Sequence, residues 1–346
     1  MKLTAVIKIA AFGLLLAGCS THSISAATSP KKNTSWRGVH LFVQSDKSAD
    51  DLTENLPKLA AQGVNVVIVE VNYSFDFKSH PELRTKNFVT RPHVKQLVTA
   101  AKKFNICLIP ELDCFGHQGN RNHVLPLLEQ HPEFTEPPWT TADKEISHMK
   151  GWCPNHPEVN PIVFKLIDEI ADAFKAKLFH AGMDEVMNIA SDNCPRCQGR
   201  DPAELFAKEV NELHGHIVRK RKMEMLIWGD RLLDGKTMKY GKWEGSTVGT
   251  WPAIDLIPKD IIICDWHYEK RESYPSVPLL VEKGFRVWPT GWKPLEATKA
   301  FSAFTREQRK QNPRVLGYLC TAWGRANSKT ITDWPPAVEI LKDWKE

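Results

Sequence analysis

Short apolar segments of strand length recur along the chain, and most of them are followed by a segment with helical periodicity. The strand-like segments cover residues 37–44, 64–72, 106–114, 177–186, 225–232, 261–268, 285–292 and 315–323. Strands that alternate with helices predict a parallel sheet, and a count of eight favours a closed barrel over an open sheet. The pattern therefore predicts an α/β fold, a (β/α)8 TIM barrel built as a single domain.

Apolar residues at i, i+3 and i+4 mark the helices that separate these strands. We expect helices over residues 48–62, 92–104, 161–176, 202–222, 277–283, 294–311 and 335–345, several with Pro near the first turn, where its missing N–H costs nothing. Residues 233–260 show no good helical pattern. This long connection between the fifth and sixth strands could fold over a bound ligand, and it is also where the strand count is weakest.

The N-terminal residues have the pattern of an export signal. An apolar run leads into Leu16-Ala17-Gly18-Cys19, which resembles a bacterial lipobox. We expect residues 1–18 to be a lipoprotein signal peptide, cleaved before a lipidated Cys19, because the apolar run is too short for a dependable membrane span. The alternative is an ordinary signal peptide that is cut near Ala26-Ala27.

Residues 19–35 are rich in Ser, Thr, Ala and Lys and carry no apolar periodicity. They are typical of a flexible tether, which leaves residues 36–346 for the barrel. Several acyl chains on one cysteine give stable anchoring, so we expect a protein of the bacterial cell envelope that is attached to a membrane by its lipid. The 46 basic residues are nearly balanced by 41 acidic ones and form no long run, which argues against nucleic acid as a partner.

The cysteines outside the signal divide into two groups. Cys107, Cys264 and Cys320 lie in apolar strand-like segments and are expected to be buried as small hydrophobic residues. The pair Cys194-Pro-Arg-Cys197, together with Cys153-Pro-Asn-His156, has the spacing of four zinc ligands. Because the two halves belong to different loops and an exported protein meets an oxidising compartment, a disulfide is favoured over zinc.

The fourth strand-like segment ends in an unusual pair of acids, Asp184 and Glu185, directly after Gly182 and Met183. A parallel strand is covered on both faces, so two adjacent carboxylates at its end carry a desolvation cost that structure alone does not require. In a barrel of parallel strands this end is where active sites lie. A helix cap with a first-turn acid is the structural alternative, and we favour a catalytic pair.

Two segments carry a family resemblance. His180-Ala-Gly-Met-Asp-Glu185 is similar to the His-x-Gly-Gly-Asp-Glu signature of glycoside hydrolase family 20, the β-N-acetylhexosaminidases, with Met183 in place of the second Gly. Ile109-Pro-Glu-Leu-Asp-Cys-Phe-Gly-His117 resembles the strand end that precedes it in the family. The resemblance extends over about residues 37–323 and implies a short form of the family, a lipoprotein whose barrel is a single catalytic domain.

The resemblance implies removal of terminal β-linked N-acetylhexosamine from glycans with retention of configuration, without a metal or an organic cofactor. The substrate's own 2-acetamido carbonyl would act as the nucleophile through an oxazolinium intermediate. By the same correspondence Glu185 is the general acid and base, Asp184 orients the acetamide, and His117 hydrogen-bonds Glu185. Burial and a neighbouring carboxylate favour the protonated form that such an acid needs.

Aromatic residues cluster at the predicted strand ends. Trp228, Trp266, Trp288, Trp292 and Trp323 fall at or near these ends, where their faces could wall a pyranose ring, although core packing is the alternative for each one. Tyr268 is the candidate for the hydroxyl that holds the acetamido oxygen in the family. Tyr240 and Tyr73 are the alternatives for this role.

Two departures from the family pattern concern recognition of the terminal sugar. The sugar-gripping Asp-x-x-Arg after the first strand is not evident in residues 40–44, and Trp323-Gly-Arg325 stands where the family often has Trp-x-Glu. One hypothesis is that Arg325 accepts an anionic substituent such as a sulfate. The sequence therefore leaves two other functions open: a glycan-binding surface lipoprotein without turnover, and a barrel glycosidase for another or a modified aminosugar.

Overall fold

The computed structural model describes residues 34–140 and 149–344 of the chain. The predicted signal peptide, the predicted lipidation site Cys19 and nearly all of the predicted tether lie outside these residues, so these three features stay predictions. No helix in the described ranges is long and apolar enough to cross a membrane.

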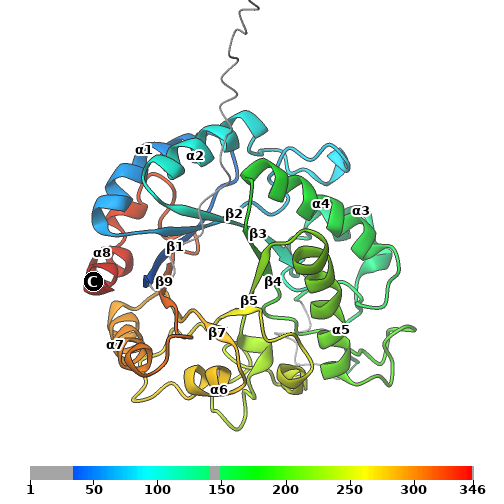
Figure 1. Cartoon of the computed structure of the whole chain (residues 1–346). Helices are drawn as coiled ribbons and strands as arrows, with labels where there is room; N and C mark the ends of the chain where they lie inside the picture. The colour runs from blue at the N-terminus through cyan, green and yellow to red at the C-terminus, as the bar shows by residue number, and fades with distance from the viewer. Residues whose placement is uncertain (1–33, 141–148, 345–346) are drawn as a thin grey trace, which may run out of the picture.

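The strands form one parallel sheet in the order β7-β6-β5-β4-β3-β2-β1-β9-β8. They are β1 Trp36–Phe42, β2 Val66–Glu70, β3 Cys107–Cys114, β4 Leu178–Gly182, β5 Glu224–Trp228, β6 Ile262–Cys264, β7 Arg286–Val287, β8 Thr290–Gly291 and β9 Gly317–Thr321. Figure 1 shows them as a central ring inside a ring of helices. The predicted (β/α)8 barrel is confirmed.

The barrel closes through the segment predicted as the seventh strand, which is divided into β7 and β8 around Pro289. β7 pairs with β6, and β8 pairs with β9. Pro289 has no N–H to donate, which ends the regular ladder, but its carbonyl accepts the Leu319 N–H at 3.0 Å. The two short strands therefore act as one barrel strand.

Helices cover the outside of the sheet between successive strands (Figure 1). They are α1 Asp46–Gln62, α2 Arg91–Lys103, α3 Pro126–Gln130, α4 Val159–Phe174, α5 Pro202–His214, α6 Ser276–Glu282, α7 Leu295–Gln311 and α8 Pro335–Leu341. The predicted helices are present with ends shifted by a few residues, except that residues 215–220 continue α5 as a π-helix. The short α3 was not predicted.

The barrel interior is filled by inward-facing side chains from alternate positions of the strands. In β1, Trp36 and His40 point inward while Val39 and Leu41 belong to the larger core under the helices. Gly38 lies between the two inward residues, and a Cβ there would come within 2.2 Å of the Trp288 indole. The glycine makes room for Trp288, which packs edge-on against Trp36 at 5.1 Å.

One layer of the barrel interior is polar and fully buried. His40 Nε2 lies 2.9 Å from Glu70 and 3.0 Å from Glu111, and His180 Nδ1 lies 2.9 Å from the other oxygen of Glu111. The Trp228 indole N–H donates to Glu111 at 2.9 Å. One side chain from each of β1 to β5 thus joins a single layer of hydrogen bonds and ion pairs directly below the carboxyl ends of the strands.

Opposite charges set the protonation of this layer. Burial alone would lower the pKa of His40, but the hydrogen bonds and charges of Glu111 and Glu70 outweigh it and raise that pKa to about 10. Burial favours the neutral form of Glu111, yet the two histidines hold its pKa down to about 2. Burial raises the pKa of Glu70 to about 7, against the opposing hydrogen bond from His40.

The raised pKa of His40 predicts a pH-dependent stability. Above about pH 6.5 the unfolded chain loses the His40 proton while the folded chain keeps it up to about pH 10, so the free energy of unfolding falls as pH rises through this window. Between pH 7 and 9, urea unfolding of the His40→Gln variant should show a shallower decline than the native chain, by up to about 1.4 kcal/mol per pH unit. Parallel slopes in these two proteins would contradict the prediction, and His123→Gln at an exposed position is the control.

Candidate active site

The turn after β4 places two carboxylates above the polar layer. Gly182, Met183 and Glu185 all have positive φ, at +65°, +78° and +48°. For Met183 and Glu185 this conformation is strained, and such strain persists only where packing imposes it. Here the Met183 side chain is fully buried, so its packing holds the turn and fixes the direction of Asp184 and Glu185.

The connection after β3 packs directly against this turn. A Cβ on Gly182 would come within 2.3 Å of the Asp113 carboxylate, and one on Gly116 within 2.0 Å of the Asp184 carbonyl. Gln118 is buried and its amide donates to the carbonyls of Asp113 and Gly116 at 2.9 and 2.8 Å. The two turns therefore leave no room for a side chain at either glycine.

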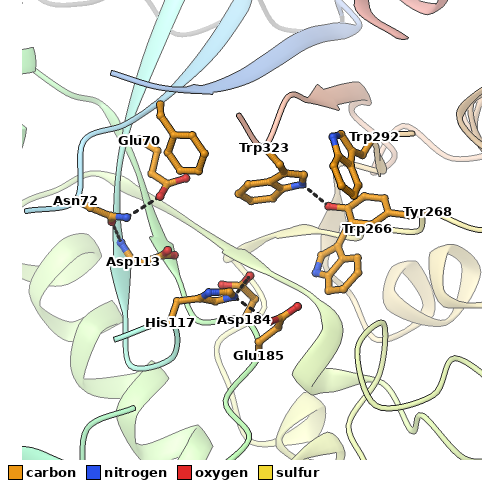
Figure 2. Close-up of a pocket in the computed structure, with 11 residues that line it drawn as sticks. Glu70, Asn72, Asp113, His117, Asp184, Glu185, Trp266, Tyr268, Trp292 and Trp323 are labelled. Carbon is orange, nitrogen blue, oxygen red and sulfur yellow. Dashed lines mark hydrogen bonds and ion pairs between the residues drawn. The ribbon is translucent and has the colours of Figure 1, made fainter. Parts of the chain in front are cut away.

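His117 joins the two carboxylates. Its Nε2 lies 3.2 Å from Asp184 Oδ2 and 3.2 Å from Glu185 Oε2, as Figure 2 shows. Burial would lower the pKa of His117, but the charge of Asp184 and the hydrogen bonds to both acids raise it well above its usual value. The expected contact between His117 and Glu185 is present, and His117 contacts Asp184 as well.

A buried ion pair supports Glu185 from below. The Glu185 backbone N–H donates to Asp230 at 3.0 Å, and the Trp266 indole N–H donates to the other oxygen of Asp230 at 3.2 Å. Arg231 is fully buried beside Asp230 and donates to the carbonyls of residues 242, 243 and 245. Asp230 thus couples the acid pair to the opposite wall. The sequence analysis missed this pair, although two adjacent charges one residue beyond an apolar strand were a visible signal.

Aromatic side chains form that opposite wall (Figure 2). Tyr268 stacks on Trp266 with ring centroids 4.8 Å apart and meets Trp292 edge-on at 5.3 Å. The Trp323 indole N–H donates to the Tyr268 hydroxyl at 2.7 Å. Burial raises the pKa of Tyr268 well above its usual value, so the hydroxyl keeps its proton.

The carboxylates and the aromatic wall enclose a cavity of about 350 Å3. Its lining contains seven of the predicted site residues: Asp184, Glu185, His117, Trp266, Tyr268, Trp292 and Trp323. Four others were not predicted as binding residues: Phe42, Glu70, Asn72 and Asp113. Glu70 could have been found, because it is the one charged residue of an otherwise apolar strand. Burial and the charge of Glu70 raise the pKa of Asp113 well above its usual value.

Two of the predicted wall residues lie elsewhere. Trp228 is fully buried in the polar layer below the cavity, where it contacts the underside of Trp323 at a centroid distance of 5.6 Å. Trp288 is fully buried deeper in the barrel, against Trp36. Assigning Trp228 to substrate binding was therefore wrong, because its indole packs inside the barrel and donates to Glu111.

Other predictions about which residues line the cavity also need correction. Within the described residues, no part of the 233–260 connection lines the cavity. Glu244 from this connection instead accepts the Tyr268 backbone N–H at 2.8 Å, which supports the wall from behind. Arg325 is exposed and does not line the cavity. Tyr73 and Tyr240 donate to Gln118 and Ser276, so Tyr268 is the tyrosine that faces the cavity.

Among the residues that the structure describes, two buried groups of side chains have donor atoms close enough together for a metal ion. His40, Glu70 and Glu111 form one of them, but there the His40 ring already lies between the two carboxylates, 2.9 and 3.0 Å from their oxygens. The other joins Cys153, Cys194 and Cys197 with Glu136. Of the four zinc ligands considered from the sequence, His156 is not in this group and packs on Phe134 instead. In the described part of the chain all the cysteines are free thiols, so the favoured disulfide is not formed.

Similar proteins are known from both sequence and structure. A 26% identical relative, lacto-N-biosidase from Bifidobacterium bifidum, matches over 249 residues, 69% of this chain and 21% of its own length. β-Hexosaminidase from Vibrio furnissii is 24% identical over 229 residues, 63% of this chain and 32% of its own length. The chain thus spans between a fifth and a third of the length of these relatives.

Solved structures show the same barrel. An exo-β-N-acetylglucosaminidase from Vibrio harveyi, in complex with N-acetylglucosamine, superposes with a TM-score of 0.66 at 18% identity, covering 91% of this chain and 55% of that one. A chitobiase from Flavobacterium johnsoniae gives 0.62 at 20% identity, covering 90% and 48%. The family model for the catalytic domain of glycosyl hydrolase family 20 matches residues 39–326. Since this match runs from within β1 through β9 and includes the acid pair, the chain belongs to glycosyl hydrolase family 20.

Proposed function

We propose that the protein is a retaining exo-β-N-acetylhexosaminidase that removes terminal β-linked N-acetylhexosamine from glycans by substrate-assisted catalysis. The observation that carries the proposal is the placement of Asp184 and Glu185 on one side of a cavity whose other side is aromatic. Relatives named β-hexosaminidase and the family membership support the same reaction class. The small cavity suits one terminal sugar better than the interior of a long chain.

In the first half of the reaction, Glu185 donates its proton to the glycosidic oxygen as the bond to C1 breaks. The carbonyl oxygen of the substrate's 2-acetamido group attacks C1 from the opposite face and forms the oxazolinium ring. Asp184 accepts the acetamide N–H and stabilises the positive charge that develops on that nitrogen. Adjacent acids with different directions suit this division of work, because no second carboxylate has to reach C1.

In the second half, Glu185 takes a proton from water as the water oxygen attacks C1 and opens the ring. Two inversions at C1 give overall retention, and Glu185 recovers its starting protonation. His117 holds both acids through one nitrogen, which fixes their spacing. Tyr268, oriented by the Trp323 N–H, donates its hydroxyl to the acetamido oxygen, and the rings of Trp266 and Trp292 pack against the sugar.

A variant specificity has its own observation. Phe42 lines the cavity near the end of β1, where the family's sugar-gripping arginine is not evident. An aromatic ring there would contact apolar sugar faces and not grip outer hydroxyls. A glycosidase for a modified aminosugar is therefore the second candidate, and a glycan-binding protein without turnover is the third.

The location is also part of the proposal. The lipobox-like Leu16-Ala17-Gly18-Cys19 supports cleavage before Cys19 and lipid attachment there. The tether of residues 19–35 would then hold the barrel at a membrane surface of the cell envelope. Its partners are this membrane and a glycan that ends in N-acetylhexosamine.

Replacement of the proposed acid tests the reaction directly. Glu185→Gln cannot donate or accept the proton, so kcat should fall by about 10² to 10⁴ on an N-acetylhexosamine linked to another sugar. On nitrophenyl β-N-acetylglucosaminide and β-N-acetylgalactosaminide the rate of the first chemical step should fall less, because nitrophenolate leaves without protonation. Steady-state and burst kinetics on both substrate types measure the difference.

The exposed Glu129→Gln is the matched control for this substitution. If Glu185→Gln retained native activity on the sugar-linked substrate, the acid would be another residue. If the native chain remained folded but released nitrophenol from neither glycoside, the proposal would be replaced by one of the other two candidates, a glycan-binding protein or a glycosidase for a modified aminosugar.

The substrate's own nucleophile gives a further prediction. Nitrophenyl β-glucoside has a hydroxyl in place of the acetamide, so it should react at least about 10²-fold more slowly than the acetamido sugar, given the effective molarity of a well-placed internal nucleophile. Asp184→Asn should reduce hydrolysis of the acetamido sugar while leaving the weak binding of the glucoside unchanged.

Proton NMR of the initial product should show the β anomer. An α anomer formed first would contradict substrate assistance.

A further inference from the structure

Three cysteines and a glutamate meet away from the cavity, where two connections of the barrel lie against each other. Glu136 and Cys153 belong to the connection between β3 and α4, and Cys194 and Cys197 to the connection between β4 and α5. All four are at most 2% exposed. None of them lines the cavity of the active site.

The spacing of the donor atoms fits a tetrahedral metal. The Cys153 sulfur lies 3.6 Å from that of Cys194 and 3.4 Å from that of Cys197, and all four donor atoms lie within 4.8 Å of one another. A zinc ion with Zn–S bonds of about 2.3 Å places tetrahedral sulfurs about 3.8 Å apart. A disulfide could join only two of the three sulfurs and would leave the third thiol buried beside Glu136.

Glu136 supplies the fourth donor. One carboxylate oxygen accepts the Ser191 backbone N–H at 2.9 Å. The other, Oε2, is buried and has no hydrogen-bond partner, and the carboxylate faces the three sulfurs. A buried acceptor without a partner carries a desolvation cost that a bound cation would remove.

Nitrogen donors lie close to the three sulfurs. The Asn155 and Arg196 backbone N–H groups are directed at the sulfurs of Cys153 and Cys194. The Asn155 side-chain amide lies 3.7 Å from the Cys197 sulfur and also donates to the Arg196 carbonyl at 3.1 Å. Such N–H groups stabilise the charged form of a metal-bound sulfur and orient it.

We propose that Glu136, Cys153, Cys194 and Cys197 bind one zinc ion as a closed structural site. Soft thiolates select zinc over calcium or magnesium, and four protein ligands leave no open position for catalysis. On binding, the three thiols release their protons to solvent and no electron is transferred. The proposal does not depend on the glycosidase reaction.

The site would tie together the two connections that carry the acid pair and its histidine. Beside Cys153, the Trp152 backbone N–H donates to the Phe115 carbonyl at 3.2 Å, two residues before His117. On the other side, Cys194 lies in the same connection as Glu185. The ion would thus hold both turns against each other from behind the cavity.

Metal analysis of the full chain tests this inference. The chain purified without chelator should contain about one zinc per molecule, and Cys153→Ser and Cys197→Ser should each lose it. Glu136→Gln should weaken zinc at least about tenfold in competition with a chromogenic chelator. Cys320→Ser is the matched control, because Cys320 is an equally buried cysteine outside the group. Cobalt substitution should add the thiolate-to-metal absorption of a tetrahedral site.

Two results would overturn the inference. One is a zinc-free chain whose non-reduced peptides show a disulfide among these three cysteines. The other is zinc that persists in both cysteine variants, which would place the ion elsewhere. Melting of the native chain in excess chelator provides a second readout that does not require the variants to fold: its Tm should fall, whereas the Tm of any folded Cys153→Ser protein should not respond.

Discussion

The buried polar layer of His40, Glu70, Glu111 and His180 is the constraint on which the site depends. Charged groups inside a barrel are tolerated only when they satisfy one another. Each member lies on a different strand, and Glu70 pairs in register with Glu111, which pairs with His180. A slip of any strand by one residue would remove its member from the layer. The layer therefore fixes the relative heights of the strand ends, and so of the turns above them.

Above this layer, tight backbone contacts between two turns hold Asp184 and Glu185 in place. These contacts matter more than the hydrogen bonds that the two carboxylates make. Gly116 and Gly182 allow the turns after β3 and β4 to touch. Met183 adopts a conformation that favours glycine, and its buried side chain anchors the turn. Packing of the Met183 side chain in the core offsets the free energy of this strain. The two carboxylates are left facing the cavity. The departure of Met183 from the family pattern is consistent with this anchoring role.

Much of this arrangement follows from the sequence, because alternation, periodicity and the position of Asp184 and Glu185 at a strand end are local properties. The errors arise where height along the barrel matters. Trp228 ends β5 and Trp266 comes just after β6, but β5 pairs Trp228 with Cys264, two residues before Trp266. At about 3.3 Å per residue, this offset separates a residue of the buried layer from one of the cavity wall. The sequence of a single strand does not contain its register with the next.

The cysteine group illustrates the same limit for loops. Paired Cys-Pro motifs indicate two halves of a site, but the fourth donor, Glu136, lies 17 residues before Cys153 in sequence with no motif around it. Folding selects it over His156 because residues 151–153 lie beside residues 134–136: the Cys153 N–H donates to the Phe134 carbonyl, and the Glu136 N–H donates to the Gly151 carbonyl. If a zinc ion binds there, the turns of the active site gain a support that is independent of the polar layer. The acid pair would then be held from below by the barrel and from behind by the metal, and His117 would have only to fix the spacing of the two carboxylates.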